Sequence, residues 1–228
     1  MRKSKIDTAE TRKRIISTAS KVFLTKGLAA TGIADIMVAA GLTQGGFYRH
    51  FESKEQLIAE ANEAAFDQLM DMFERAIAGK PPAQALDTIV FRYLHQLQGR
   101  DPVYLCPLAN LGSELRHADE QVKATTKDGY ERLVRLVALQ TQRLGMPGYA
   151  DVANAIVSTL VGAVTLSRLA ADASTQKAIL LNAHNVVRVL LQAAPQTIAP
   201  ARKRLRARTD DTDNEVLGGS ELRSIPTD

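Results

Sequence analysis

Apolar side chains recur every three or four residues along most of this chain, up to about residue 194. That spacing is the period of an α-helix, and the strict alternation typical of half-buried strands is almost absent. Glycine and proline interrupt the pattern, most clearly at residues 79–82 and 145–148. The sequence therefore predicts an all-α fold. We expect helices over residues 8–26, 32–40, 44–50, 54–78, 83–98, 107–117, 120–144, 151–171 and 175–193.

Positive charge is concentrated in the first quarter of the chain. Residues 1–54 carry ten Lys and Arg against four Asp and Glu, whereas residues 55–194 carry thirteen against fifteen. A basic head on a slightly acidic body indicates an anionic polymer as the partner of the head. From residue 195 the composition changes to ARKRLRAR followed by TDDTDNE, which predicts a disordered tail. We therefore divide the chain into 1–54, 55–194 and 195–228.

Several classes of protein are disfavoured by composition. The N-terminal MRKSKIDTAETRKR has no apolar h-region, and no uninterrupted apolar run approaches the roughly 18 residues of a membrane helix. A single cysteine, Cys106, allows no intrachain disulfide. We expect a cytoplasmic protein without a membrane partner.

The stretch GLTQGGFYRHF, residues 41–51, places two glycines inside a short expected helix. Each costs roughly 1 kcal/mol relative to alanine in a helix. On an α-helical wheel Phe47 points inward, Gly45 and Arg49 point outward, and Gly46 and Tyr48 flank that outer face. Preceded by a helix that Thr31 is expected to cap, this layout predicts a helix-turn-helix. The missing side chains would let the backbone approach a duplex closely.

The side chains around the glycines suit DNA contacts. Gln44 can pair with adenine, and Arg49 can pair with guanine or phosphate. Phosphate contacts are expected from Tyr48, Lys54 and the helix N-termini after Thr31 and Ser53.

The residues TGIADIMVAAGLTQGGFYRHFESKEQLIAEA resemble the DNA-binding head of the TetR family of bacterial transcription regulators. The resemblance covers about residues 10–60. It implies an all-α homodimer, usually a repressor, that a small molecule releases from DNA. Because many relatives carry a longer side chain at the position of Gly46, more specificity is expected from Gln44 and Arg49. The resemblance implies DNA contacts at Thr31, Thr43, Gln44, Gly45, Gly46, Tyr48, Arg49, His50 and Lys54.

The last two expected helices, within 151–193, are apolar on wide faces and rich in small residues. The resemblance implies that they form a four-helix interface with a second copy. A dimer also suits the head, because one short recognition helix reads only a few base pairs. Two copies would read palindromic double-stranded DNA with half-sites about one helical turn apart.

The resemblance implies that the helices between 54 and 144 enclose the effector cavity. Such a pocket is mostly apolar, so we expect an apolar effector of unknown identity. Its candidate lining residues are Phe66, Met70, Phe73, Phe91, Tyr93, Leu94, Tyr104 and Leu108. Cys106 lies at the expected start of a helix, where the thiol pKa can be lowered. An oxidant- or electrophile-sensing repressor acting through Cys106 is therefore an alternative, and a buried structural thiol is the other reading.

Two other classes of protein are disfavoured by the sequence. Glu114 and His117 have the i, i+3 spacing of helical di-iron enzymes, but no second Glu-x-x-His exists. No nucleophile motif or phosphate-binding loop is present either, so we expect no enzyme, no cofactor and no metal. A sequence-indifferent DNA-coating protein would be expected to carry more positive charge.

Overall fold

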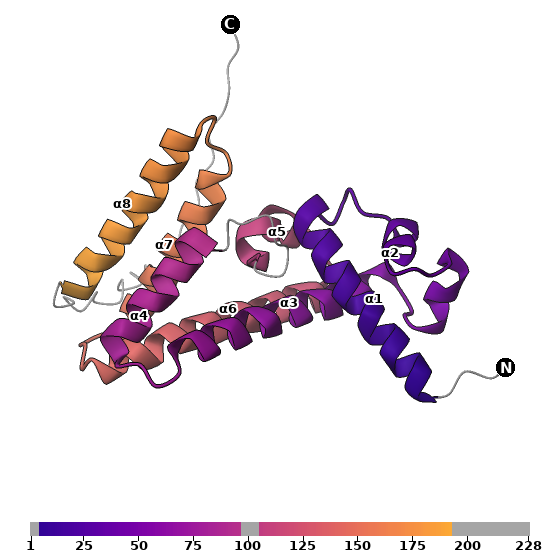
Figure 1. Cartoon of the computed structure of the whole chain (residues 1–228), viewed down its shortest axis with the longest axis horizontal. Coiled ribbons are helices and arrows are strands. Elements are labelled where there is room, and N and C mark those ends of the chain that lie inside the picture. Colours follow the sequence, from indigo (N-terminus) through magenta and orange to yellow (C-terminus); the bar gives the residue numbers. More distant parts are fainter. Residues whose placement is uncertain (1–4, 97–104, 193–228) are drawn as a thin grey trace, which may run out of the picture. The chain divides into compact units, whose positions relative to one another are not determined.

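The structure is a computed structural model that describes residues 5–96 and 105–192, all within one compact unit, Met1–Thr197. Every regular element in these residues is a helix, which confirms the all-α prediction (Figure 1). The predicted tail from residue 195 lies outside the described residues. The elements are α1 (Lys5–Lys26), α2 (Ile33–Ala39), the 3-10 helix η1 (Gln44–Arg49), α3 (Lys54–Ile77), α4 (Pro82–Phe91), the π-helix η2 (Arg92–Gln96), α5 (Pro107–Leu115), α6 (Glu120–Arg143), α7 (Tyr149–Ser167) and α8 (Ala173–Gln192).

Local signals set most helix ends. Gly27 takes φ +88° immediately after α1, a left-handed conformation that favours glycine at a helix C-terminus. Ser53 precedes α3, and its hydroxyl accepts a hydrogen bond from the Gln56 N–H at 3.0 Å, as its position predicts. Gln56 has the spacing of a capping box with Ser53 but does not complete one, because its Oε1 accepts from the Glu52 N–H at 2.7 Å.

The predicted cap of α2 is wrong by one residue. Gly32 is the N-cap, and its N–H donates to the Asp35 carboxylate at 2.9 Å. The Thr31 hydroxyl instead donates to the Gly27 carbonyl at 2.6 Å, and Thr31 is 1% exposed. Thr31 therefore closes the turn between α1 and α2. The helix predicted over 83–98 also differs, because it divides into α4 and η2.

Two hydrophobic cores share helix α3. The N-terminal half of α3, up to Ala65, packs with α1, α2 and η1, which we call the head. From Phe66 onward α3 packs with α4, α6, α7 and α8, which with α5 form the body. Leu111 and Leu115 of α5 belong to the head core, although α5 begins in the body core. Helices α3 and α5 thus connect the two cores.

Helices α3 and α6 run side by side along their length (Figure 1). They approach so closely at Gly129 that a Cβ placed there would lie 2.2 Å from Cδ2 of Phe66. Phe66 is fully buried, so its ring cannot swing into solvent. Glycine is therefore required at this crossing by the space available.

Gly129→Ala is expected to destabilise the protein by about 2 kcal/mol, because overpacking outweighs the gain in helix propensity. Gly112→Ala is the matched control, since a Cβ at Gly112 on α5 meets no heavy atom within 4 Å. That control is expected to stabilise the protein by up to about 1 kcal/mol. Urea unfolding at fixed protein concentration measures both variants. A Gly129→Ala protein at least as stable as the parent would contradict the close approach.

Helices α7 and α8 lie side by side and carry apolar side chains that the single chain does not cover (Figure 1). By length and composition α7 is also the one helix in the described part of the chain that could cross a membrane, but 44% of that stretch is buried inside the protein. The exposed large apolar residues of these helices and their connection include Leu166, Leu169, Leu181, Val186 and Val189.

Candidate nucleic-acid interface

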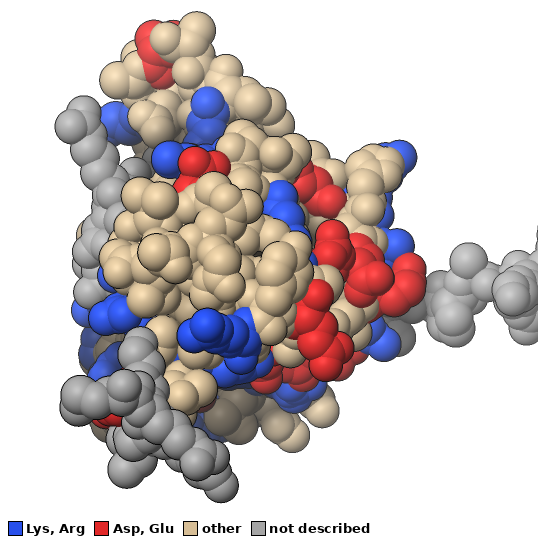
Figure 2. Space-filling view, turned by 90° about the vertical axis from the view of Figure 1, so that its right-hand side faces the viewer, with Lys and Arg blue, Asp and Glu red and all other residues tan. Residues whose placement is uncertain are grey.

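The surface of η1 carries most of the predicted DNA contacts. Thr43, Gln44, Gly45 and Arg49 are exposed, and Tyr48 is 72% exposed. Figure 2 looks onto the end of the molecule at which the head lies; its middle is uncharged, with Lys and Arg around it and Asp and Glu gathered along one side. Uncharged groups that can approach bases, with cations at their edge, suit a duplex.

The helical type of η1 changes the predicted wheel. In a 3-10 helix residues i and i+3 eclipse, so Gly45 shares a side with Tyr48 and Gly46 shares a side with Arg49. The remaining side holds Gln44 and Phe47; Phe47 is fully buried, whereas Gln44 at the first position of the element is exposed. The four predicted outer residues therefore still surround the buried Phe47, but in pairs that differ from those of an α-helix.

The two glycines differ in their surroundings. A Cβ at Gly45 would meet no heavy atom within 4 Å, so the backbone there is open to solvent. A Cβ at Gly46 would lie 3.6 Å from Cε of Met37, an ordinary contact, and Gly46 is half-buried. The bare backbone surface is therefore centred on Gly45.

Aromatic packing holds this short element in place. The rings of Phe47 and Phe51 stack with centroids 5.5 Å apart, and Tyr48 meets Phe47 edge-on at 5.1 Å. Phe47 and Phe51 are buried in the head core. Such pairs add about 0.5–1.5 kcal/mol beyond their buried area, which offsets the helix cost of the glycines.

Arg12 of α1 binds the C-terminal end of η1. Its Nε donates to the His50 carbonyl at 3.3 Å, and its guanidinium lies 4.7 Å from the centroid of the Phe51 ring. The other guanidinium nitrogens contact the Glu60 carboxylate of α3 at 2.5 and 2.6 Å. Arg12 thus joins α1, η1 and α3 through one planar group.

Three of the predicted contacts lie outside the exposed surface of η1. Thr31 is a correction, because its buried hydroxyl is used by Gly27 and does not reach the surface. His50 is half-buried. The Lys54 ammonium donates to the Leu28 carbonyl at 3.0 Å, which uses one of its three N–H groups.

Val38 was missed by the sequence reasoning. It lies on α2 and is 74% exposed, although it is a large apolar residue. The signal was available, since Val38 falls between the positions of the inward stripe formed by Ile36, Met37 and Ala40. Arg12 was missed for another reason: its partners are far away in the sequence.

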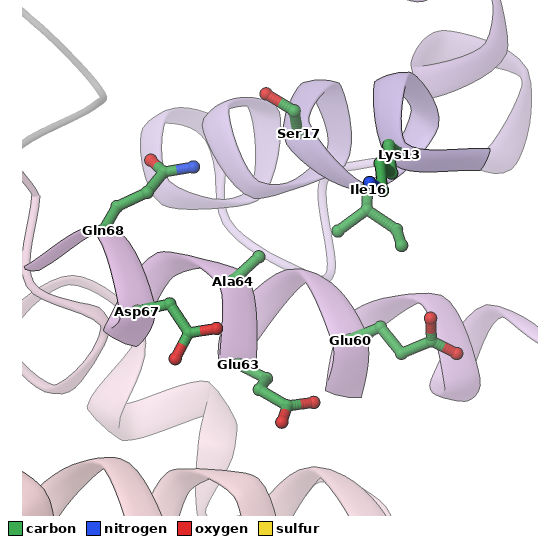
Figure 3. A pocket seen from close by; sticks show the side chains of 8 residues that line it. All are labelled: Lys13, Ile16, Ser17, Glu60, Glu63, Ala64, Asp67 and Gln68. Carbon is green, nitrogen blue, oxygen red and sulfur yellow. The ribbon is translucent and has the colours of Figure 1, made fainter. Parts of the chain in front are cut away.

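A hollow of about 340 Å³ lies between α1 and α3, with Ile16 and Ala64 pointing toward it (Figure 3). Its rim carries Glu60, Glu63 and Asp67 against Lys13. This charge has the wrong sign for phosphate, so the hollow is not part of the nucleic-acid interface.

Comparison with known proteins agrees with this geometry. Residues 15–61 match the family model of bacterial regulatory proteins of the tetR family. Residues 82–180 match the C-terminal domain of LmrA/YxaF-like transcriptional regulators. Together the two matches span more than half of the chain. The chain belongs to the TetR family.

Individual TetR relatives differ in their sequence identity to this chain and in the share of each chain that the match covers. The uncharacterized regulator YerO of Bacillus subtilis is 41% identical over 80 residues, which cover 34% of this chain and only 28% of YerO. The uncharacterized regulator Rv0196 of Mycobacterium tuberculosis is 29% identical over 171 residues, covering 71% and 86% of the two chains. A TetR regulator structure from Chloroflexus aurantiacus matches with TM-score 0.68 and 27% identity over 80% of this chain and 96% of that one. TetR regulators bind DNA as dimers and respond to small molecules.

The predicted TetR effector residues are mostly core. Phe73 and Tyr93 stack with ring centroids 6.3 Å apart inside the body, and both are fully buried. Phe91 is a correction, because it is 51% exposed and packs against the His95 ring at 4.9 Å, on the outside. Tyr104 lies outside the described residues. The remaining predicted lining residues are Phe66, Met70 and Leu94, which are buried, and Leu108, which is half-buried.

Of the two readings of Cys106, the structure supports the buried structural thiol and not the activated sensor. Cys106 is the N-cap of α5, and its thiol is fully buried beside the Tyr93 hydroxyl. Burial raises the pKa of the Cys106 thiol above its ordinary value, although the N–H groups of Leu108 and Ala109 act in the other direction. The thiol is therefore held protonated and shielded from solvent.

Iodoacetamide is expected to alkylate Cys106 at least about 100-fold more slowly in the native protein than in urea, because reaction requires an opened, ionised thiol. Because burial raises the pKa of the Cys106 thiol, the native rate is expected to stay low even at pH 8.5, the ordinary pKa of cysteine. Mass spectrometry of the single-cysteine chain measures both rates. Equal native and denatured rates at pH 7.5 would contradict the burial and restore the sensor alternative.

The enzyme alternative gains no support from this TetR structure. Glu114 is directed to the α1–α2 loop, where its Oε2 accepts from the Ala29 N–H at 2.7 Å. Within residues 5–96 and 105–192, no group of three or more His, Cys, Asp or Glu side chains could hold a metal ion. Glu114 and His117 are thus not brought to further metal ligands among these residues.

Proposed function

We propose that the protein is a sequence-specific transcriptional repressor whose homodimer binds a palindromic operator with η1 in the major groove. The observation that carries this proposal is the open backbone at Gly45, flanked by exposed Gln44, Tyr48 and Arg49 above a buried Phe47. A bare main chain between polar side chains allows a closer approach to base edges than any residue with a Cβ.

Individual roles follow from exposure and chemistry. Gln44 and Arg49 read bases, and Thr43, Tyr48 and Lys54 contact phosphates. Val38 offers an apolar contact, such as a thymine methyl group or a sugar. His50 lies at the C-terminal end of η1 and contributes mainly through its carbonyl, which Arg12 holds.

The dimer forms through α7 and α8. The exposed apolar side chains on this pair of helices need cover in water, and a second copy supplies the same surface by two-fold symmetry. The two heads then present two copies of η1 to half-sites about one helical turn apart. A regulator of chromosomal DNA works in the cytoplasm, which we propose as the location.

The body is proposed to bind a small apolar effector that releases the protein from DNA. The support is the family and the apolar character of the body core around Phe73 and Tyr93. Oxidant sensing through Cys106 is disfavoured, because its thiol is buried and burial raises its pKa.

The experiment uses DNA from immediately upstream of the protein's own reading frame. Fluorescence anisotropy at 150 mM salt is expected to show nanomolar binding to a duplex that contains a palindrome, and binding about 1000-fold weaker to the same bases in shuffled order. Equal affinity for both duplexes at that salt concentration would remove the sequence-specific proposal and favour a sequence-indifferent DNA-coating protein.

Arg12→Met removes charge-assisted hydrogen bonds that hold the C-terminal end of η1. Because this end is released, operator affinity is expected to fall about tenfold. The dependence of log affinity on log salt separates this role from a phosphate contact. A positioning residue leaves the slope unchanged, whereas a direct phosphate contact reduces it by about one.

Glu60→Met is the matched partner of that variant. Removal of a negative charge near DNA should strengthen binding by simple electrostatics, but loss of the Arg12 partner should weaken it. We expect weaker binding, because Glu60 holds Arg12 at 2.5 Å. Stronger binding of Glu60→Met would show that Arg12 does not act by holding η1.

A further inference from the structure

A cavity of about 470 Å³ lies where the head meets the body. Its size falls within the range of about 300–1,000 Å³ typical of small-molecule sites. Three parts of the chain build it: the α1–α2 loop, the start of α3, and the stretch from the end of α5 to the start of α6. Its lining residues include Leu28, Lys54, Ile58, Ser113, Glu114 and Val122.

The cavity has an apolar floor. Leu28, Ile58 and Val122 line it and are each less than 9% exposed, so each offers only a small apolar surface to the cavity. Ala118 adds a further apolar surface from the α5–α6 connection. An apolar group of a ligand would displace water from this floor on binding.

Acidic side chains dominate the charge of the same cavity. Glu55, Glu114 and Asp119 line it together with the His117 imidazole, and Lys54 brings the one ammonium group. The Lys54 ammonium is directed to the Leu28 carbonyl at 3.0 Å. The excess of carboxylates over ammonium groups is therefore complementary to a positively charged ligand and repels a carboxylate or phosphate.

Glu114 connects this cavity to the head. Its Oε2 accepts a hydrogen bond from the Ala29 N–H at 2.7 Å, and its Oε1 lies 2.7 Å from the position that a Cβ on Gly27 would occupy. Glu114 belongs to α5, whose other end begins in the body core at Cys106. The α1–α2 loop of the head is thus held by a carboxylate of the body.

We propose that this cavity is a second ligand site, separate from the effector pocket of the body, and that it takes a small organic cation with an apolar body, such as an arylalkylamine. The ammonium group pairs with Glu114, with Glu55 and Asp119 adding long-range attraction, and the apolar part covers Leu28, Ile58 and Val122. Because the ligand competes with Ala29 for the Glu114 carboxylate, its binding loosens the loop that precedes α2. This coupling to DNA rests on the proposed function, whereas the binding itself does not.

Three probes with the same phenylpropyl body test the site by titration calorimetry of the full chain without DNA. 3-Phenylpropylammonium is expected to bind saturably. 3-Phenylpropanol is expected to bind at least about tenfold more weakly, and 3-phenylpropanoate not at all, because charge-assisted hydrogen bonds are the strong ones. Absence of saturable binding of the ammonium probe, or equal affinity of all three probes, would overturn the proposal.

Two variants assign the binding to this cavity. Glu114→Gln keeps the shape and a carbonyl acceptor for Ala29 but removes the charge, and is expected to weaken the ammonium probe at least about tenfold. Ser113→Phe fills the cavity from an exposed position and is expected to abolish binding, whereas Gly112→Phe, its exposed neighbour outside the cavity, leaves binding unchanged. Binding that both Glu114→Gln and Ser113→Phe leave unchanged would place the probe elsewhere and overturn the proposal.

Operator binding in the presence of saturating 3-phenylpropylammonium tests the coupling. We expect the operator affinity to fall severalfold in the parent protein and to stay unchanged in Ser113→Phe. Unchanged operator affinity in the parent protein would overturn the coupling between the cavity and DNA binding. The calorimetry would still decide whether the cavity is a ligand site. If the protein binds no operator even before the probe is added, the proposed function fails. That outcome differs from a failure of the ligand site, which the calorimetry without DNA detects.

Discussion

Gly45→Leu is expected to lower operator affinity at least about 100-fold while folding and dimerisation stay unchanged. A Cβ at this position would meet no heavy atom within 4 Å, and Gly45 is exposed, so the added side chain can point into solvent in the free molecule. In the complex it would stand between the backbone of η1 and the base edges, and would keep Gln44 and Arg49 from their partners. Anisotropy against the operator duplex measures the loss, and circular dichroism confirms the fold.

Two matched variants show whether the loss comes from the site or from the substitution itself. Gly112→Leu introduces the same side chain at another exposed glycine with open space around it, and should leave operator affinity within about twofold. Gly45→Ala should fall between the parent and Gly45→Leu, because it adds one methyl group. Parent-like operator binding by Gly45→Leu would show that η1 does not dock through its bare backbone.

Leu181→Glu is expected to raise the dimer dissociation constant at least about 1000-fold, because each dimer would bury two carboxylates at an interface that lost two leucines. Leu181 lies on α8 and is 55% exposed in the single chain, among the other apolar side chains left uncovered by α7 and α8. Sedimentation velocity over a range of protein concentrations measures the constant. Operator affinity should fall with it, because a monomer contacts one half-site only.

Leu144→Glu is the control for that variant. Leu144 is 42% exposed at the end of α6 and belongs to neither helix of the proposed interface, so the same added charge should leave the dimer intact. If Leu181→Glu and Leu144→Glu sediment alike as dimers, the interface lies on another surface of the body.

The parts of the fold that were predictable depend on local rules. Gly27 ends α1 because a left-handed residue terminates a helix, and Ser53 begins α3 because a hydroxyl can cap the free N–H groups. The inward position of Phe47 follows from periodicity, and it holds in a 3-10 helix as well as in an α-helix. These features need no knowledge of distant contacts.

The features that were not predictable depend on neighbours far away in the sequence. Arg12 meets Glu60, and Glu114 meets Ala29, across 48 and 85 residues, and no spacing rule links such pairs. Cys106 carries a favourable local signal at a helix N-terminus, but burial in the body core raises its pKa instead. Thr31 similarly has the residue type of a cap and yet bonds backward to Gly27. In each case tertiary contacts outweigh the local preference.

Hydrogen exchange of the backbone amides of residues 42–51 with and without operator tests the central claim most directly. Docking of the bare backbone predicts slower exchange at Gly45 and Gly46 with the palindromic duplex, and no change with the shuffled duplex at the same salt concentration. Saturating operator binding that leaves exchange in this segment unchanged would contradict the account.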